Sequence, residues 1–547
     1  MSELAPELQS MIAAAFLPYE TSAAKRAVLD AMLEVLNATM DGLRAERNGM
    51  VPIHRLPNEL LVHIFSYHPA WDERGLATRM LVCRRWFGVV LDSPTLWSVI
   101  DFDWEGVKYG SLRRRLVRSK DAPLRVNIER LKHTGITELL LGASSRLQQL
   151  SIAGARECMV DLLEQMFAQS FPLLQDLALE MTDYGAEEEE ESEGFLVDLE
   201  LSGALLSRMP NLYALKLVNI STEWTSLHSL RYLTINARKA NLANPIHFHV
   251  LLSILRECPE LVELQLDCVL MPGTPELYSV VHLQRLTLLH LRDSCFFIED
   301  ILNYVVFPGN TRLSLFPLGI NDGSDIRALL VPIRLHLRSP LSPAPEVMSF
   351  SVPKSEDGGV ISNFKIDFDT AANHARGFSD ALQPLLGLNS HPPTARSLRQ
   401  ILAKIMHAVP TQRVTHLSAE IAHDISAKTW ALALTHLPSL ERVDIFLENS
   451  AAQLCQALAG LKKAPPLRLI HVSDFTHGPD EDKSYVAPFL GELKTLLQKH
   501  RDAGRTVEKL VFKFYAWGVE RRSEQPLVED WSEIKALVRE LVVEEKQ

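Results

Sequence analysis

Apolar residues follow a repeating pattern along most of this chain. From about residue 101, a unit recurs in which an amphipathic helix ends near a proline and leads into a stretch of the form P-x-L-x-x-L-x-L. The clearest copies begin at Pro172, Pro210, Pro259 and Pro438. Apolar and polar residues alternate within each stretch, so each copy predicts a strand that buries one face and exposes the other.

Weaker copies of the strand and the intervening helices extend this pattern. The weaker strands are Leu147-Leu150-Ile152, Leu230-Leu233-Ile235, Leu283-Leu286-Leu288 and Val507-Leu510-Phe512. Apolar spacing of 3.6 residues predicts helices at residues 160–167, 199–209, 250–255, 398–406 and 454–461. Strand and helix units of roughly 20 to 40 residues cannot bury their apolar faces singly, whereas stacked neighbours can. The pattern therefore predicts an α/β solenoid over residues 101–547, closed by a capping helix from about residue 530.

A separate apolar seam precedes the repeats, in residues 22–47. Its positions, at alternating spacings of four and three, are Leu29, Leu33, Leu36, Met40 and Leu43. This spacing predicts a helix within an N-terminal amphipathic segment of residues 1–50. About two heptads are visible, fewer than the three to four that identify a coiled coil. We therefore favour a helix docked on its own protein, with a coiled coil as the alternative.

Charge, cysteine usage and hydropathy exclude several classes of protein. The formal net charge is −12 and no long basic stretch offsets it, so we expect no general affinity for nucleic acid, which rests on Lys and Arg. The six cysteines are scattered and form no CxxC pair, as is typical of a reducing compartment. No run approaches the roughly 18 apolar residues of a membrane span, and no basic region precedes the short apolar run near the N-terminus. We expect a cytoplasmic and/or nuclear protein without a membrane partner.

Exposed segments are predicted from local composition. The acidic run at residues 187–191 and the Pro/Ser-rich stretches at residues 339–345 and 390–397 indicate loops. An acidic run can also dock a basic partner, although a solvated loop is the simpler interpretation. The arginines between residues 113 and 118 are expected on the solvated face of a helix.

Residues 53–97 carry the most specific pattern in the chain. Pro57 suits the first position of a helix. Two apolar stripes follow, the first at Leu60, Leu61, Ile64 and Phe65, and the second, in a further helix, at Val82, Trp86, Val89 and Val90. Asp92-Ser93-Pro94 then predicts a turn that brings Leu96-Trp97 back toward these helices. A module of about 50 residues buries too little surface to be robust alone, so part of this apolar surface is expected to bind a partner.

In this order and spacing, the segment resembles an F-box over residues 52–100. By its layout the whole chain resembles fungal proteins that join a short N-terminal helix, an F-box and divergent leucine-rich repeats. The resemblance implies an all-α F-box module that binds the Skp-type adaptor of an SCF-type cullin-RING ubiquitin ligase, with the repeats as receptor for a protein substrate. Carried over position by position, it implies that the adaptor contacts or their immediate support are Leu56, Pro57, Ile64, Phe65, Val82, Cys83, Trp86 and Trp97. The segment at residues 66–75 departs from the family pattern and contains Pro69 and Trp71.

The repeats resemble a leucine-rich-repeat horseshoe of irregular form. Asn219 and Cys268 arrive one residue earlier than the Asn or Cys of the L-x-x-L-x-L-x-x-N/C-x-L signature. Polar positions that alternate with the buried leucines are expected to form an exposed ladder that binds substrate. Its residues are Lys216, Tyr232, Glu263, Gln265, Asp267, Arg285, Arg442, Asp444 and Phe446. The acidic centre at Glu263 and Asp267 favours a basic substrate segment, while a merely solvated sheet face is the alternative.

Enzyme signatures are absent from the sequence. No Walker loop, G-x-G-x-x-G, H-E-x-x-H, G-x-S-x-G or paired-cysteine zinc pattern occurs, so we expect neither catalysis nor a cofactor. His247 and His249, expected on one strand face, lack a third ligand nearby, so no metal site is expected. Two alternatives stay open. One is a scaffold that acts outside ubiquitination, and the other is an enzyme whose site is assembled from distant residues.

Overall fold

The computed structural model describes most of the chain, and its description covers two units. The described residues are 10, 21–67, 73–102, 109–131, 134–182, 196–197, 199–237, 241–242, 246–271, 278–320, 325–352, 364–374, 384–390, 395–421, 425–446, 450–474, 486–515 and 531–546. The chain divides into compact units at residues 1–130 and 131–547, so the unit boundary lies later than the predicted residue 101. The difference arises because strand β1 (Val99–Phe102) pairs in parallel with β2 (Leu124–Leu131) around helix α7 (Tyr109–Arg118).

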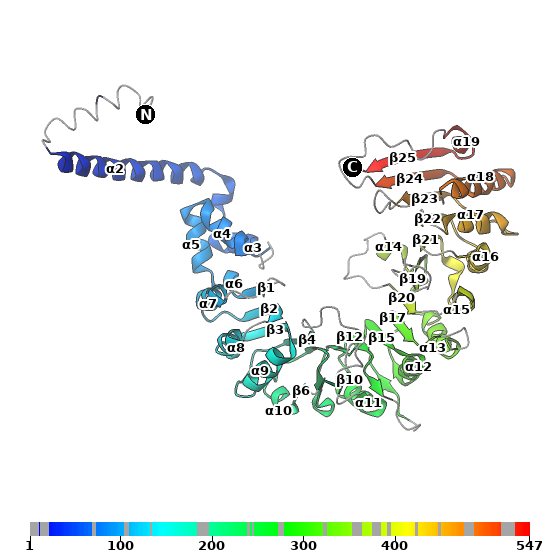
Figure 1. The fold of residues 1–547 in the computed structure, drawn as a ribbon, viewed down its shortest axis with the longest axis horizontal. Helices are drawn as coiled ribbons and strands as arrows, with labels where there is room; N and C mark the ends of the chain where they lie inside the picture. The colour runs from blue at the N-terminus through cyan, green and yellow to red at the C-terminus, as the bar shows by residue number, and fades with distance from the viewer. Residues whose placement is uncertain are drawn as a thin grey trace. The chain divides into compact units, whose positions relative to one another are not determined.

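In the first unit, the predicted helix is α2 (Ser22–Gly49), which is shown in blue in Figure 1. The hydroxyl of Thr21 caps it by accepting a hydrogen bond from the Ala24 amide at 3.3 Å. None of its residues is buried, and the four seam residues from Leu33 to Leu43 are 49 % to 61 % exposed. The helix is confirmed. Its seam is not covered by the described residues of the first unit, and docking of the seam on the protein itself stays a prediction. Periodicity specifies an apolar face without specifying what covers it.

Short helices form the rest of the predicted F-box module. They are η1 (Pro52–Arg55), α3 (Asn58–Ser66), α4 (Glu73–Val82), α5 (Arg84–Asp92) and α6 (Pro94–Trp97). The second predicted helix is divided, because Val82 ends α4 and Cys83 caps α5. One core joins these helices and comprises Leu61, Phe65, Leu76, Val89, Val90, Leu96 and Trp97.

The arginines of α7 do not all lie on a solvated face. Arg113 and Arg114 are exposed as predicted, whereas Arg115 is 1 % exposed and donates from Nη1 to the Val99 carbonyl at 2.8 Å. The Arg118 guanidinium lies 4.4 Å from the centroid of the Trp97 ring. Composition alone misses this because a guanidinium can be buried when a carbonyl or an aromatic face receives it.

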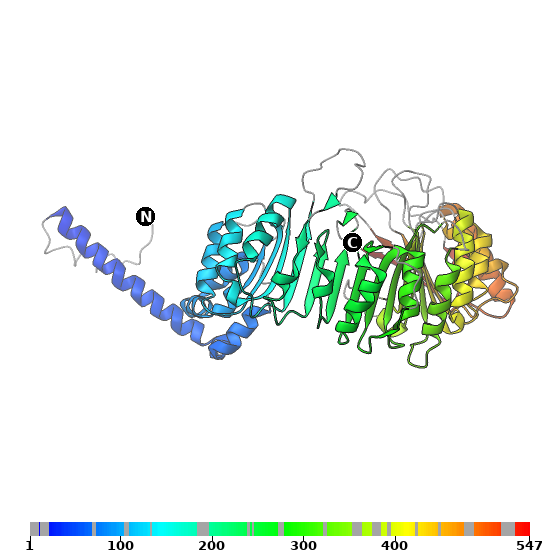
Figure 2. The same ribbon diagram turned by 90° about the horizontal axis from the view of Figure 1, so that it is seen from below.

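The second unit is a large, mostly parallel sheet with helices (Figures 1 and 2). Its first strands pair in chain order as β3 (Leu147–Gly154), β4 (Asp176–Met181), β7 (Ala214–Val218), β9 (Tyr232–Asn236), β12 (Glu263–Asp267), β15 (Leu288–Ser294) and β17 (Arg312–Leu318). The last strands do the same, as β21 (His416–Ile421), β22 (Arg442–Phe446), β23 (Leu469–Asp474), β24 (Lys509–Tyr515) and β25 (Glu540–Lys546).

Between these two runs the strand order reverses. Strand β17 pairs with β20 (Leu386–Ser390), and β20 pairs with β19 (Phe364–Asp369). Strand β19 pairs in turn with β18 (Val347–Val352), and β18 pairs with β21. Strand β19 is antiparallel to both of its neighbours. The chain therefore passes over two strand positions after β17 and fills them on its way back.

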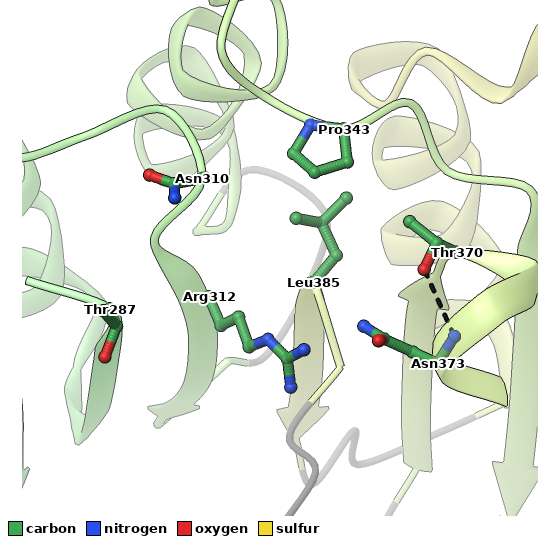
Figure 3. A pocket seen from close by; sticks show the side chains of 7 residues that line it. All are labelled: Thr287, Asn310, Arg312, Pro343, Thr370, Asn373 and Leu385. Atoms are coloured by element: carbon green, nitrogen blue, oxygen red, sulfur yellow. Dashed lines mark hydrogen bonds between the residues drawn. The ribbon is translucent and has the colours of Figure 1, made fainter. Parts of the chain in front are cut away.

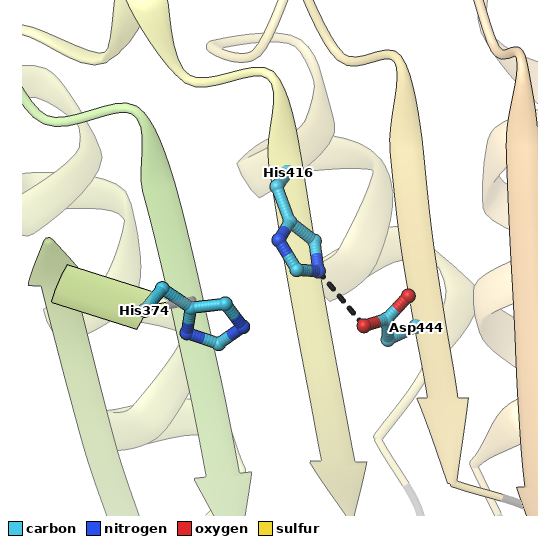
Figure 4. Close-up of side chains that lie close together, drawn as sticks. All are labelled: His374, His416 and Asp444. Carbon is cyan, nitrogen blue, oxygen red and sulfur yellow. Dashed lines mark hydrogen bonds and ion pairs between the residues drawn. The ribbon is translucent and has the colours of Figure 1, made fainter. Parts of the chain in front are cut away.

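Helices cover one face of this sheet, as Figures 1 and 2 show. They are α8 (Thr134–Leu141), α9 (Arg156–Met166), α10 (Gly203–Leu206), α11 (Phe248–Glu257), α12 (Cys295–Tyr304), α13 (Arg327–Leu337), α15 (Ala395–Ala408), α16 (Ala427–Leu434), α17 (Ala451–Gly460) and α18 (Val486–Asp502). Among the described helices, only the short α14 (Ala371–His374) lies on the opposite face, which we call the open face (Figures 1 and 4). The 3-10 turns are η2 (Ser144–Arg146), η3 (Trp224–Ser226) and η4 (Thr411–Arg413).

Four small parallel pairs complete the described strands. They are β5 (Leu196–Val197) with β10 (Asn241–Leu242), β6 (Glu200–Leu201) with β8 (Ser221–Thr222), β11 (Ile246–His247) with β13 (Leu270–Met271), and β14 (Val281–His282) with β16 (Val305–Val306). His247 ends β11 and His249 lies in α11, so the two imidazoles are not on one strand face as expected. No helix in the described part of the chain is long and apolar enough to span a membrane.

The predicted strands are present, with one error of register. Leu264 of β12 pairs with Leu289 and Leu266 pairs with Leu291, so the buried leucines of β15 are not those predicted at 283, 286 and 288. Leucines also stand at 286, 289 and 291, and both phases fit the L-x-x-L-x-L spacing. Pairing with β12 selects the second phase, which local spacing cannot do.

Two predicted helices are much shorter in the structure than the sequence indicates. Residues 199–209 contain only the short α10, after β6. The expected capping helix from about residue 530 is a short helix, α19 (Ser532–Lys535), followed by β25, because residues 540–546 pair with β24 instead of continuing the helix. Residues 339–345 form the predicted connection, whereas Ser390 ends β20 and α15 begins at Ala395. The acidic run at residues 187–191 lies outside the described residues.

Candidate functional site

Helix α3 separates its apolar residues onto two sides. Leu61 and Phe65 are 0 % and 4 % exposed and belong to the core, whereas Leu60 and Ile64 are 49 % and 43 % exposed. The prediction that these four residues share one stripe is therefore wrong. Positions i and i+1 lie about 100° apart around a helix, so each pair divides between core and solvent.

Several large apolar side chains of the F-box module are exposed to solvent. The set, which we call the apolar face, comprises Leu60, Ile64, Tyr67, Leu81, Val82 and Phe87. Leu81 at 85 % and Tyr67 at 78 % are the most exposed of them. Side chains of this size are expected inside a module unless a partner covers them, so the arrangement is suited to binding an apolar surface of another protein.

The predicted contact residues divide between this face and its support. Pro57, Ile64 and Val82 are exposed, and Leu56, Cys83 and Trp86 are half-buried. Phe65 and Trp97 are buried, where Phe65 packs 4.7 Å from Trp86 between ring centroids, and Trp97 Nε1 donates to the Val90 carbonyl at 2.7 Å. Leu60, Tyr67, Leu81 and Phe87 were not among the predicted contacts. Tyr67 was detectable in the sequence, because Leu60, Ile64 and Tyr67 follow the spacing i, i+4, i+7.

Arg85 fixes the entry into α3. Its guanidinium donates to the backbone carbonyls of His54 and Leu56, and to Asn58 Oδ1 from Nη2 at 2.9 Å. These bonds tie η1 and the start of α3 to α5. Arg84 contacts Asp41 of α2, so neighbouring arginines join α5 to two different segments.

Replacing Arg85 by lysine is expected to destabilise the F-box module. Lysine retains the charge but cannot form the planar set of donors that reaches two carbonyls and an amide together. We expect a loss of about 1 to 3 kcal/mol in the free energy of unfolding, in the range of hydrogen bonds that involve a charged group. Denaturant unfolding followed by tryptophan fluorescence measures it. Arg113→Lys, at an exposed position of α7, is the control, and equal losses in the two variants would contradict this role of Arg85.

The predicted ladder on the open face is only partly exposed. Tyr232 is 38 % exposed, and Lys216 lies 3.8 Å from the Glu180 carboxylate. Glu263, Gln265, Arg442 and Phe446 are half-buried in their strands. Arg285 precedes β15 and pairs with Glu260, so it is not part of the ladder. The register error described above placed it there, and His290 and Arg292 hold the ladder positions of β15.

The centre of the ladder is not acidic as predicted. Asp267 is 3 % exposed, and Arg292 of the neighbouring strand lies 3.7 Å from its carboxylate. Arg292 also stacks 4.4 Å from the centroid of the Phe316 ring. A buried carboxylate whose charge is neutralised by a neighbouring arginine does not attract a basic segment, so the expected preference for a basic substrate is not supported at Asp267.

A polar cluster lies on the open face beneath α14 (Figure 4). His374 of α14 faces His416 of β21 with ring centroids 4.7 Å apart, and His416 Nε2 lies 2.9 Å from Asp444 Oδ2. Arg442 donates from Nε and Nη2 to the two Asp444 oxygens at 2.8 Å and 2.7 Å. Asp444 is 9 % exposed, so the predicted ladder residues Arg442 and Asp444 form an ion pair within the sheet face.

The cluster resembles a metal site in its geometry but not in its electrostatics. His374, His416 and Asp444 offer ligand atoms within 4.8 Å of one another. Arg442 already occupies both carboxylate oxygens, so a metal cation would bind next to a guanidinium and compete with it. We therefore interpret the cluster as an ion-pair network that orders α14 on the sheet.

Acidification is expected to weaken this network in two stages. Burial raises the pKa of the Asp444 carboxyl, but the hydrogen bonds from His416 and Arg442 outweigh burial and lower that pKa to about 2. Its stabilising contribution is therefore complete above about pH 4 and is lost as the pH falls toward 2. His471 of β23 also belongs to the network, with its Nδ1 3.9 Å from Asp444 Oδ1. Burial lowers the pKa of His374 and of His471 in the folded chain, so these two histidines take up protons in the unfolded state before the folded state as the pH falls below about 6.5.

Denaturant unfolding between pH 7 and pH 5 tests the histidine stage. We expect the decline in the free energy of unfolding to be smaller in His374→Gln/His471→Gln than in the wild type, because the variant has lost the groups that protonate on unfolding. The exposed His228 provides the control variant His228→Gln. Identical declines in wild type and double variant would contradict the assignment.

A small polar cavity of about 380 Å³ adjoins α14 (Figure 3). It is lined by Thr287, Asn310, Arg312, Pro343, Thr370, Asn373 and Leu385. The backbone amide of Asn373 donates to Thr370 Oγ1 at 3.4 Å, so the Thr370 side chain caps the start of α14. Most of the lining can form hydrogen bonds, so the cavity suits a polar side chain better than an apolar anchor.

Comparison with known proteins identifies the family of the helical module in the first unit. A family model described as F-box-like matches residues 53–103, close to the predicted 52–100. No curated protein matches the chain significantly. F-box domains generally bind Skp-type adaptors, which is consistent with the exposed apolar face. The module at residues 53–103 is an F-box-like domain, and the chain is supported as an F-box protein.

Proposed function

We propose that this chain is the substrate-recognition subunit of an SCF-type cullin-RING ubiquitin ligase. One observation carries the proposal: an F-box-like domain leaves Leu60, Ile64, Tyr67, Leu81, Val82 and Phe87 exposed on a module with a closed core. The Skp-type adaptor is the partner that would cover this face. In this proposal the chain has no catalytic role of its own, needs no cofactor, and acts in the cytoplasm or the nucleus.

The second unit would be an irregular leucine-rich-repeat solenoid. Support comes from strands that pair in parallel and in chain order, each burying leucines at corresponding positions. Asn219 and Cys268 directly follow their strands at positive φ, +56° and +55°. The Asn219 side chain donates to the Met181 carbonyl at 3.1 Å, so it links neighbouring units although it arrives one residue early in the repeat signature.

The substrate would bind on the open face. Helices occupy the other face, and Tyr232 presents an exposed aromatic ring next to the half-buried Glu263 in register. Tyr213 lies 6.2 Å from Tyr232 between ring centroids, and aromatic side chains are enriched at the centres of protein interfaces. We therefore place the principal substrate contacts at Tyr232 and Glu263.

Affinity purification of the full chain, with identification of the recovered proteins, tests both halves. We expect adaptor and cullin to be recovered with the wild type. In Tyr232→Ser/Glu263→Lys we expect the same adaptor recovery but loss of a subset of other partners. Partners that persist in the wild type without adaptor or cullin would instead identify a scaffold outside ubiquitination. Glu164→Lys, which makes the same change of charge at an exposed position of α9 in the same unit, is the control for unspecific charge effects.

A further inference from the structure

A shallow groove lies on the helix-covered side of the second unit, between α13 and α15. Its volume is about 680 Å³. The lining comes from two packed helices and comprises Arg327, Leu330, Val331, Arg334, Leu335, Arg338, Ala403, Lys404, His407 and Ala408. Figure 1 shows these helices side by side on the face opposite the open one, so the groove is separate from the surface proposed for substrate.

The charged residues that line the groove are all cationic. No acidic residue occurs between Asp325 and Glu346 or between Asp380 and Glu420, although the whole chain has a net charge of −12. Within the described part of the chain, Arg327, Arg334, Arg338 and Lys404 make no ion pair and no side-chain hydrogen bond. Four cationic groups, of which three are exposed and Lys404 is half-buried, therefore line one groove, and no carboxylate among the described residues pairs with them.

An apolar strip runs between these cations. Val331 and Leu335 are 59 % and 69 % exposed and stand at i and i+4 on α13. Arg327, Arg334 and Arg338 fall on the same side of the helix, at i−4, i+3 and i+7 relative to Val331. A surface helix normally turns its apolar residues inward, so two exposed aliphatic side chains flanked by unpaired arginines indicate a contact surface.

We propose that this groove binds an acidic amphipathic helical segment of a partner protein. Two parallel ridges of side chains accept a third helix between them, with its aliphatic residues on Val331 and Leu335. Asp and Glu beside those aliphatic residues would pair with the arginines and with Lys404. A flat bilayer would touch only the rims of a concave groove, and a nucleic acid has no side chains to cover the aliphatic strip. A protein segment therefore fits both features together.

A peptide selection tests the proposal on the full chain. The probe is a displayed random library of about 16 residues, long enough for four helical turns. Binders to the wild type are counter-selected on Arg334→Glu/Arg338→Glu. We expect survivors to carry aliphatic residues at i, i+4 flanked by Asp or Glu. The best synthetic peptide should bind the wild type with an affinity that falls as salt is raised.

Matched variants define the outcome. We expect at least about tenfold weaker peptide binding to Arg334→Glu/Arg338→Glu and to Val331→Ser/Leu335→Ser, as for central contacts of an interface. Lys462→Glu/Lys463→Glu, which makes the same change of charge outside the groove, should stay within about twofold of the wild type. All six substituted positions are exposed, so folding is expected to be preserved.

Three results would overturn the proposal. They are a selection without acidic, aliphatic survivors, equal binding of the peptide to wild type and groove variants, or groove-dependent binding only to vesicles of phosphatidylcholine and phosphatidylserine. Adaptor binding is measured in parallel and should be unchanged in every groove variant, so failure of this proposal is distinguishable from failure of the proposed ligase role.

Discussion

The double variant Ile64→Asp/Leu81→Asp is expected to lose adaptor binding while its F-box-like domain stays folded. Both side chains are exposed in the free chain, at 43 % and 85 %, so neither aspartate is forced into the core. In a complex the two carboxylates would be desolvated against an apolar surface. Central contacts of an interface contribute about 2 to 4 kcal/mol each on truncation, so a loss of at least about 4 kcal/mol, or about 1000-fold in Kd, is expected.

Binding of purified adaptor to immobilised wild type and variant measures this effect. Val117→Asp is the matched control, because Val117 is 70 % exposed on α7, outside the matched residues 53–103. The control should bind as the wild type does, and all three proteins should unfold at similar temperatures. A double variant that binds with unchanged Kd would show that the apolar face does not contact the adaptor.

Removal of residues 531–547 is expected to make the second unit aggregate. Ile534, Leu537 and Val538 are 0 %, 9 % and 8 % exposed, and Trp531 packs 4.7 Å from Phe512 between ring centroids. Each buried aliphatic side chain contributes about 1.5 to 3 kcal/mol, so several kcal/mol of stability depend on this short segment. Its removal also leaves β24 as an uncovered edge that can pair with another chain.

Light scattering after size exclusion, with thermal unfolding, detects the loss. The control is Val543→Ser, because Val543 is 45 % exposed on the same strand that is deleted. We expect the control to behave as the wild type and the truncated chain to form large species or unfold at a clearly lower temperature. A truncated chain that stays dispersed with an unchanged unfolding temperature would show that the last strand is not part of the core.

The elements that the sequence predicted well are those whose signal is local. The strands at Leu177, Leu215, Leu264 and Val443 combine alternation with a preceding proline, and each is a strand with those residues buried. The F-box segment was identifiable because several motif positions occur in order within about 50 residues. Both signals depend on neighbours in sequence.

The predictions failed where contacts between residues distant in the sequence determine the structure. Pairing with β12 sets the phase of β15, and the reversed order β20, β19, β18 depends on partners far apart in the chain. The burial of Asp267 and Asp444 depends on Arg292 of a neighbouring strand and on Arg442. The absence of acidic residues around α13 and α15 was visible in the sequence, but the groove that gives it meaning requires the two helices to pack together.

Direct titration of the purified full chain with a purified Skp-type adaptor tests the central claim. We predict saturable binding at one adaptor per chain, with a Kd below about 1 μM, which corresponds to more than about 8 kcal/mol of binding free energy. We also predict that the same titration of Ile64→Asp/Leu81→Asp shows no saturation. A wild-type chain that is folded but binds no adaptor at concentrations well above about 10 μM would contradict the claim.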